Sequence, residues 1–124
     1  MDLDFSSDQD ELRDSIRSVL RNEAPITLAR AVTEHEGSAD ALWATVVELG
    51  WPALTVPEEF GGIGLGTVEA SILAEELGRV VAPGILLATV TQFVPLVRAS
   101  GDAEQRAQWL RSEEHTSELQ SPCN

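Results

Sequence analysis

Residues 80–97 carry no charged side chain at 18 consecutive positions, close to the length of a membrane-spanning helix. Two prolines, a glycine and three uncharged polar residues interrupt this stretch, and no cluster of basic residues flanks it as in the positive-inside pattern. We therefore interpret it as a buried helix of a globular domain. Because it is apolar on nearly every face, it needs neighbours all around it. A chain of 124 residues supplies too few helices for that, so we expect an exposed apolar patch and a missing partner domain or subunit.

Apolar residues recur with helical spacing along most of the remaining chain, and no stretch alternates with the period of two that marks a half-buried strand. The predicted helices are 8–22, 25–32, 39–49, 68–77, one from about 84 onward, and a short one after Asp102. The residues predicted to cap or end them are Ser7, Ser38, Gly50, Thr67 and Gly78. Pro95 is predicted to kink or end the fifth helix, and Asp102 and Gln105 are spaced as a capping box. The sequence thus predicts an all-α fold.

The chain is strongly acidic, with 21 acidic residues against 8 basic ones and a formal net charge of −13. This balance excludes nucleic acid as a partner, because such binding needs a basic surface that displaces phosphate counterions. It argues against an anionic membrane for the same reason. The single cysteine, Cys123, has no partner for an internal disulfide, and the acidic N-terminus lacks the basic region of a secretory signal. We therefore expect a reduced, cytoplasmic protein.

A glycine-rich segment over residues 57–66 resembles a phosphate-binding loop at first sight. Such a loop normally joins a strand to a helix and presents free backbone N–H groups to the anion. Here no strand is predicted before it, its glycine spacing fits no nucleotide fingerprint, and no P-loop lysine follows. Glu58 and Glu59 would also repel a phosphate. We interpret the segment as a structural turn.

The polar residues form no cluster typical of catalysis. His35 lies between two glutamates in a polar stretch, which predicts a solvated side chain. Glu75 and Glu76 are adjacent in a predicted helix, so their side chains diverge, and Glu75 is spaced to pair with Arg79. The sequence therefore predicts no catalytic, cofactor-binding or metal-binding residue. For Thr89, Thr91 and Gln92, two interpretations stay open: a packed helix or the wall of a pocket.

The last 14 residues, 111–124, differ in composition from the rest and have one aliphatic residue, Leu119. They fit a disordered C-terminal tail. However, the run Arg-Ser-Glu-Glu-His-Thr-Ser-Glu-Leu-Gln-Ser at 111–121 resembles the translation of a common sequencing-library adapter. We therefore expect residues 111–124 to be an artefactual or disordered tail and the native chain to be cut off there.

Four segments in the same order resemble the N-terminal helical domain of the acyl-CoA dehydrogenase family. They are Leu-Gly-Trp-Pro at 49–52, Val-Pro-Glu-Glu-Phe-Gly-Gly-Ile-Gly at 56–64, Ala-Glu-Glu-Leu-Gly-Arg at 74–79, and 101–110 with Gln105, Gln108 and Trp109. The opening, with Phe5, Ser6, Gln9 and Leu12, is similar too. Each segment alone is a weak signal, but together they cover about residues 3–110.

The resemblance implies that residues 1–110 are the all-α, up-down N-terminal domain of a larger flavoprotein. In this family a β-barrel domain and a C-terminal helical bundle follow, and they hold most FAD contacts and a glutamate base. FAD is therefore not expected to bind this fragment, and the fragment alone is expected to be inactive. The implied reaction is the α,β-dehydrogenation of an acyl-CoA thioester in fatty acid metabolism. Aligning on Pro95 implies that Leu87 and Thr91 line the acyl channel.

Two alternatives to a truncated dehydrogenase remain open. In the first, the parent protein is a related flavin-dependent oxidase or monooxygenase. In the second, the chain is a non-catalytic helical partner subunit. In each case we expect an oligomer of identical or related subunits.

Overall fold

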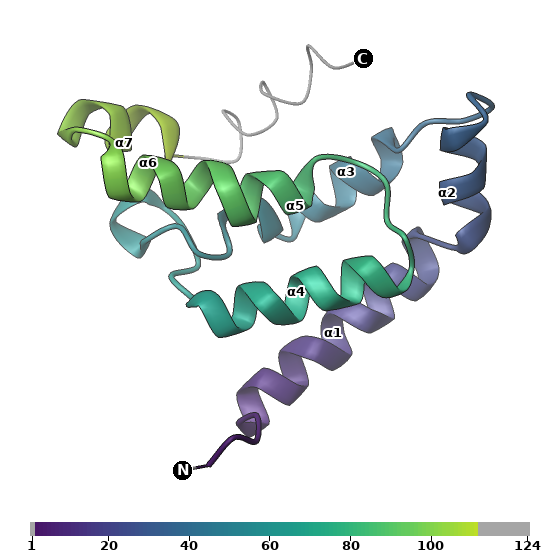
Figure 1. The fold of residues 1–124 in the computed structure, drawn as a ribbon, viewed down its shortest axis with the longest axis horizontal. Helices are drawn as coiled ribbons and strands as arrows, with labels where there is room; N and C mark the ends of the chain where they lie inside the picture. Colours follow the sequence, from purple (N-terminus) through teal and green to yellow (C-terminus); the bar gives the residue numbers. More distant parts are fainter. Residues whose placement is uncertain (1, 112–124) are drawn as a thin grey trace.

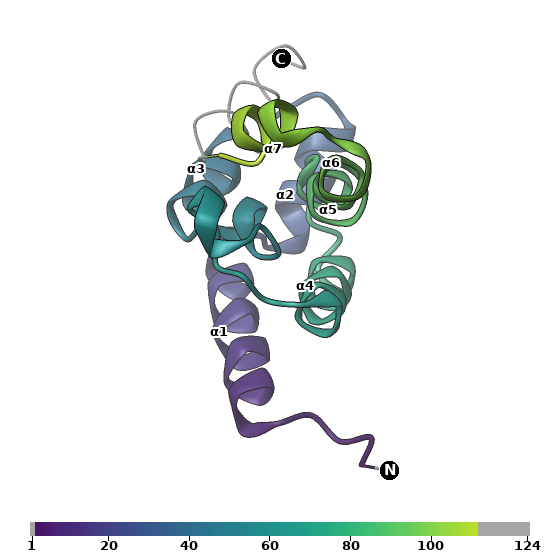
Figure 2. The same cartoon turned by 90° about the vertical axis from the view of Figure 1, so that its left-hand side faces the viewer.

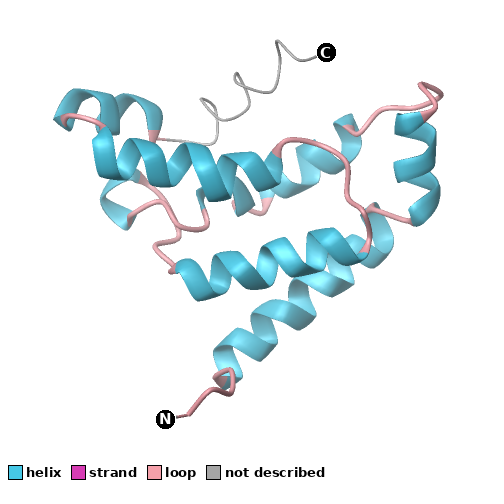
Figure 3. Cartoon of the chain, viewed as in Figure 1, coloured by secondary structure: helices cyan, strands magenta, loops and turns pink. Residues whose placement is uncertain are grey.

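A computed structural model of the chain describes residues 2–111, and the tail predicted from sequence lies outside the described residues from position 112 onward. Seven α-helices are present in this part: α1 (Ser7–Glu23), α2 (Ile26–Thr33), α3 (Asp40–Glu48), α4 (Thr67–Arg79), α5 (Leu86–Ala88), α6 (Val94–Ser100) and α7 (Ala103–Trp109). Two short 3-10 turns, η1 (Trp51–Ala53) and η2 (Glu58–Phe60), lie in the long loop between α3 and α4. The described residues contain no strand (Figure 3), which confirms the all-α prediction.

One long rod, residues 86–100, is built from α5, a π-helical turn η3 (Thr89–Phe93) and α6, and we call it the 86–100 helix. It runs antiparallel to α4, with the connecting loop at one end (Figure 1). The side of α4 that faces away from the 86–100 helix packs against α1, and α1 and α4 lie side by side in both views (Figures 1 and 2). Helix α7 folds back against α6 at the far end. This is the up-down arrangement expected from the sequence.

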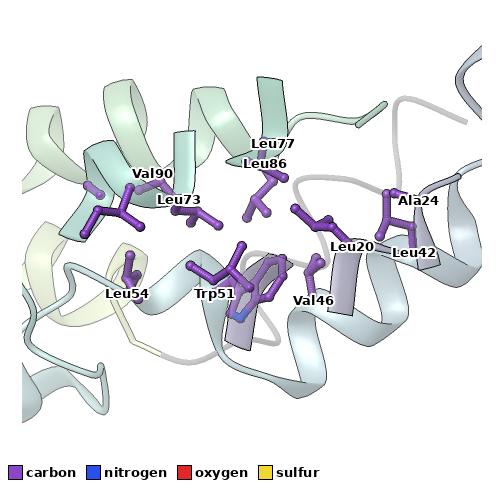
Figure 4. Close-up of a cluster of buried hydrophobic side chains, with 13 residues drawn as sticks. Leu20, Ala24, Leu42, Val46, Trp51, Leu54, Leu73, Leu77, Leu86 and Val90 are labelled. Atoms are coloured by element: carbon purple, nitrogen blue, oxygen red, sulfur yellow. The ribbon is translucent and has the colours of Figure 1, made fainter. Parts of the chain in front are cut away.

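The hydrophobic core lies where α1, α3, η1, α4 and the 86–100 helix meet (Figure 4). Its buried side chains include Leu20, Val46, Trp51, Leu73 and Val90. A second cluster of Val56, Val94 and Leu110 joins the long loop to α6 and α7. Helix α2 buries none of its residues and lies at one end of the molecule. The 86–100 helix thus contacts the domain along one side only.

Three of the predicted N-terminal caps lie one position away from the observed ones. Ser6, not Ser7, caps α1: its Oγ accepts from the Gln9 backbone N–H at 3.2 Å, and the Gln9 side chain accepts from the Ser6 N–H at 2.9 Å. Gly66, not Thr67, caps α4, because the Glu69 carboxylate accepts from the Gly66 N–H at 3.2 Å. Ser38 lies one position outside the cap of α3 and accepts from the Asp40 N–H at 3.4 Å.

Of the two predicted breakers, Gly78 does not end its helix, whereas Pro95 distorts its helix without ending it. Gly78 lies inside α4, which continues to Arg79, and the left-handed residue that follows is Val81. Pro95 lies in the second position of α6, and the helix continues to Ser100. Proline has no N–H and crowds the carbonyl four residues before it. The preceding turn therefore widens into η3, where Val94 donates to the carbonyl of Thr89 five residues back. By contrast, the Gly50 end and the Asp102–Gln105 capping box are confirmed.

Candidate functional site

A cavity of about 290 Å³ lies between α3, the C-terminal half of α4, and the start of the 86–100 helix. Helix α3 contributes Leu42, Trp43 and Val46, and α4 contributes Leu77 and Gly78. The loop 81–84 and the first residues of the 86–100 helix close the remaining sides. No charged side chain lines the cavity, which makes it a site for apolar groups.

The rim of this cavity is held by the backbone at the end of α4. The N–H of Ala82 donates to the carbonyl of Leu77 at 3.0 Å, and that of Val81 donates to Gly78 at 3.2 Å. This Schellman arrangement forces Val81 into the left-handed region, with φ of 52°. A β-branched residue is strained there, because its side chain crowds the following carbonyl. Val81 is 60% exposed, so the packing of its side chain contributes little stability to offset this strain.

Replacing Val81 with glycine is therefore expected to raise the free energy of unfolding by about 1 kcal/mol. The gain arises because glycine adopts the left-handed conformation without the steric penalty. Urea unfolding followed by circular dichroism measures it. His35 occupies the same position at the end of α2, with φ of 59°. Since histidine tolerates this region better than valine, His35→Gly is the matched control and should change stability less. A lower stability for Val81→Gly would contradict the assignment of strain.

The structure places Leu87 and Thr91 one turn apart on the same face of the 86–100 helix. Leu87 is 48% exposed and lines the cavity. Thr91 is exposed, lies outside the cavity, and its Oγ1 donates to the carbonyl of Leu87 at 2.6 Å. Thr89 is buried and donates to Ile85 at 3.2 Å. Both threonines thus satisfy themselves on the preceding turn, as the packed-helix interpretation predicts.

Two large apolar side chains of the 86–100 helix are exposed. Leu86, Val90 and Val94 point into the two clusters, whereas Leu87 and Leu96 are 48% and 63% exposed. Contiguous exposed apolar patches mark interaction sites. Exposed apolar side chains are present on this helix, as expected, and a partner that covers them stays a prediction.

The glycine-rich segment is a closed turn and not an anion cradle. Every backbone N–H from Phe60 to Leu65 donates to a backbone carbonyl, for example Ile63 to Ala53 at 3.0 Å and Gly64 to Val56 at 2.9 Å. The N–H of Gly66 donates to the Glu69 carboxylate at the start of α4. No N–H group of residues 60–66 is left for a phosphate, so these residues do not fit the pyrophosphate of a dinucleotide. The structural interpretation of this segment is confirmed.

Sequence reasoning missed the most charged cluster of the domain. Glu76 is buried in α4, with 2% of its side chain exposed, and accepts from two arginines of α1. Arg17 binds it through two nitrogens at 2.8 and 3.0 Å, and Arg13 donates at 2.9 Å. The hydrogen bond from Arg17, then that from Arg13, holds the pKa of Glu76 below its ordinary value, although burial opposes this.

The predicted pair between Glu75 and Arg79 is not formed. Glu75 binds Arg13 at 3.2 Å, and Arg79 lies 3.7 Å from Glu76 instead. The reason is that α1 packs against α4 and brings the Arg13 side chain within 3.2 Å of the Glu75 carboxylate. One signal was available: Glu76 follows Ile72 and Leu73 on the buried face of α4, where a carboxylate needs partners.

The remaining polar residues form no metal-binding group among residues 2–111. His35 is exposed, as predicted, and no group of three residues able to bind a metal ion occurs in this range. Within the same range no helix combines the length and the hydropathy needed to cross a bilayer.

The described residues form an all-helical domain with an apolar cavity between α3 and α4. Residues 6–112 match the family model described as "Acyl-CoA dehydrogenase, N-terminal domain". The chain therefore belongs to the acyl-CoA dehydrogenase family, as the resemblance predicted.

Curated relatives carry the same family name. The chain is 34% identical over 96 residues to acyl-CoA dehydrogenase IpdE2 of Mycobacterium tuberculosis, which covers 75% of this chain and 30% of the relative. It is 28% identical over 107 residues to FadE12 of the same species, covering 85% and 27%. It is 31% identical over 101 residues to the short-chain specific mitochondrial enzyme of Sus scrofa, covering 80% and 24%. The chain thus spans less than a third of these relatives. No solved structure gave a match.

Proposed function

We propose that this chain is the N-terminal domain of an FAD-dependent acyl-CoA dehydrogenase, which desaturates an acyl-CoA thioester between its α and β carbons. The observation that carries the proposal is the family match over residues 6–112, which includes nearly every described residue. The catalytic base and most FAD contacts belong to the parts of the protein beyond this domain. The domain alone is inactive and supplies packing and one wall of the acyl channel. The proposal includes a cytoplasmic location and an oligomer of identical or related subunits.

The channel wall is assigned to Leu87 and Thr91. Both lie on the uncovered face of the 86–100 helix, and Leu87 presents a large exposed aliphatic surface there. The threonine hydroxyl donates to the helix backbone, so its methyl group and the leucine side chain together offer an apolar surface to a hydrocarbon. This supports contact with an acyl chain, whereas the thioester and the CoA group need polar partners elsewhere.

The experiment is to extend the coding sequence beyond codon 111 from the source DNA and purify the complete protein. We expect a yellow protein that reduces an artificial electron acceptor when an acyl-CoA is added. The isolated chain is expected to be colourless, because residues 60–66 have no free N–H groups for the flavin pyrophosphate. A colourless complete protein without activity would contradict the dehydrogenase proposal and favour the non-catalytic partner subunit. Flavin reduction coupled mainly to oxygen consumption would favour an oxidase or monooxygenase.

In the complete enzyme, Leu87→Trp is expected to lower kcat/KM for its preferred acyl-CoA about tenfold, because the larger indole narrows the channel. The effect should be smaller for the shortest acyl-CoA accepted. Leu96→Trp is the matched control: Leu96 is also exposed on the same helix, 63% against 48% for Leu87, but lies outside the assigned wall. Steady-state kinetics over a series of acyl chain lengths provide the measurement. Equal losses of kcat/KM for both variants would show that Leu87 does not line the channel.

A further inference from the structure

The π-helical turn η3 gives the two halves of the 86–100 helix a common orientation toward the domain. Leu86, Val90 and Val94 are all buried, and they are spaced four residues apart. In a regular α-helix each of these steps rotates the side chain by about 40° beyond a full turn, so Val94 would point about 80° away from Leu86. The wider turn of η3 holds one extra residue and nearly cancels this rotation. Leu86 and Val90 therefore face the core while Val94 faces the second cluster.

A regular α-helix through the same residues would change which side chains point outward. With α6 held in place, each residue before η3 would move by one position around the helix, a rotation of about 100°. Leu87 would then take the place of Leu86, and Thr91 would take the place of Val90. The two residues assigned to the channel wall, which are exposed in the structure, would be buried in the core.

The composition of this segment does not prevent such a rotation. The residues buried at present are Leu86, Thr89 and Val90, and those buried after the rotation would be Leu87, Val90 and Thr91. Each set has one leucine, one valine and one threonine, so the volume in the core is conserved. The Thr91 hydroxyl already donates to the Leu87 carbonyl at 2.6 Å, so it needs no new partner once it is buried.

Rotation of α6 instead is opposed by packing. It would bring Phe93 to the place where Val94 is buried in the second cluster, and the larger side chain would overpack this cluster. Arg98 also ties α6 to the loop after α3, because its Nη1 donates to the Thr55 carbonyl at 3.2 Å. The half of the helix that carries Leu87 is therefore the half that would turn.

Pro95 excludes the regular α-helix. Its nitrogen carries no hydrogen for the Thr91 carbonyl four residues before it, and in an α-helix its ring would crowd that carbonyl. In η3 the N–H of Val94 donates to the Thr89 carbonyl five residues back, and the wider turn makes room for the ring. The proline thus selects one of two rotations that the core composition allows.

We infer that Pro95 is a positioning residue: through η3 it keeps Leu87 and Thr91 on the exposed side of the 86–100 helix. The inference rests on the proposed function, which assigns these two residues to the channel wall. Short π-helical turns are frequent at functional sites. The orientation of the wall is then set by a residue that lies one turn beyond it.

The first test measures thiol accessibility on the isolated chain, in a Cys123→Ser background that leaves one cysteine in each variant. Thr89→Cys and Thr91→Cys form a matched pair. Both hydroxyls donate to the carbonyl four residues back, but Thr89 is buried and Thr91 is exposed. The thiol reagent DTNB is therefore expected to react at least about tenfold faster with the Thr91→Cys variant.

Adding Pro95→Ala is expected to bring the two rates together or reverse their order. The reaction should become about tenfold slower in Thr91→Cys, which turns into the core, and about tenfold faster in Thr89→Cys, which turns to the exposed place of Ala88. A rotation moves the two rates in opposite directions, whereas local unfolding raises both. Unchanged rates in both variants, or an increase in both, overturn the inference.

Deletion of Gln92 is the rescue. The π-helical turn holds one residue more than an α-helical turn, and Gln92 is exposed within it. Removing it from the Pro95→Ala chain gives a regular helix with Leu87 and Thr91 in their present orientation. We expect the reaction rates of the parent pair to return, and circular dichroism verifies that each variant is folded. Rates that stay at the Pro95→Ala values overturn the inference, because the extra residue then does not set the orientation.

The second test separates this inference from the proposed function. In the complete enzyme, Pro95→Ala should raise KM for the preferred acyl-CoA about tenfold with a smaller change in kcat, and deletion of Gln92 should restore KM. If the enzyme oxidises acyl-CoA but its KM is the same with Pro95→Ala, the inference fails and the proposed function stands. If no acyl-CoA is oxidised, the proposed function fails, and the thiol experiment decides whether Pro95 sets the orientation of the helix.

Discussion

Replacing Glu76 with alanine is expected to lower the free energy of unfolding by about 3 kcal/mol, a large fraction of the stability of a domain this size. The carboxylate is buried and holds Arg13 and Arg17 of α1 through three hydrogen bonds of 2.8–3.0 Å. Without it, Arg13, whose side chain is mostly buried, loses one of its two carboxylate partners and keeps the exposed Glu75. Urea unfolding at neutral pH measures the difference.

Glu75→Ala is the matched control for this experiment. Glu75 is the adjacent residue and also binds Arg13, at 3.2 Å, but its side chain is 60% exposed. Exposed ion pairs contribute at most about 1 kcal/mol, so the control should be nearly neutral. Similar losses for the two variants would show that burial of Glu76 is not what makes its charge important.

The same cluster sets the response to acid. Since the pKa of Glu76 is lower in the folded protein than its ordinary value of about 4.5, folding favours the ionised carboxylate. Its contribution to stability is therefore complete above that value and is lost as the pH falls through the lower, folded pKa. Glu76→Gln removes this part of the dependence. Its stability should fall less steeply than that of the parent below pH 4.5.

Gly62→Ala is expected to lower the free energy of unfolding by about 3 kcal/mol for a purely steric reason. A Cβ at Gly62 would overlap the carbonyl oxygen and the Cβ of Val56. The carbonyl of Val56 is fixed, because it accepts from the Gly64 N–H at 2.9 Å, and its side chain is buried in the second cluster. The backbone must therefore move. Chemical denaturation gives the magnitude.

Gly61→Ala is the neighbouring control. Gly61 has a φ of 84°, so alanine is strained there, but a Cβ meets no atom within 4 Å. The cost should be about 1 kcal/mol, the penalty of the left-handed conformation alone. If Gly61→Ala cost more than Gly62→Ala, the close approach between residues 62 and 56 would be incorrect.

Sequence reasoning was sound where the signal is local. Helical spacing, the Gly50 end and the capping box of Asp102 and Gln105 depend on residues within a few positions, and the structure contains them. It was wrong for Gly78, because α4 continues to Arg79. At Pro95 the helix continues, and the distortion takes the form of the π-helical turn η3. It also missed the partners of Glu76, because they lie 59 and 63 positions away in the chain. The cavity likewise depends on how α3 and α4 meet, which no local pattern encodes.

The link between α1 and α4 has a consequence for synthesis on the ribosome. Helix α1 is made first, but its two arginines have no buried carboxylate to bind until residue 76 has left the exit tunnel. In that interval the apolar side of α1, with Ile16 and Leu20, lacks its contacts with α4. Its other side carries Asp8, Asp10, Glu11 and Asp14, all exposed in the finished domain. We therefore expect this negative charge to keep the incomplete domain in solution while α4 is still being synthesised.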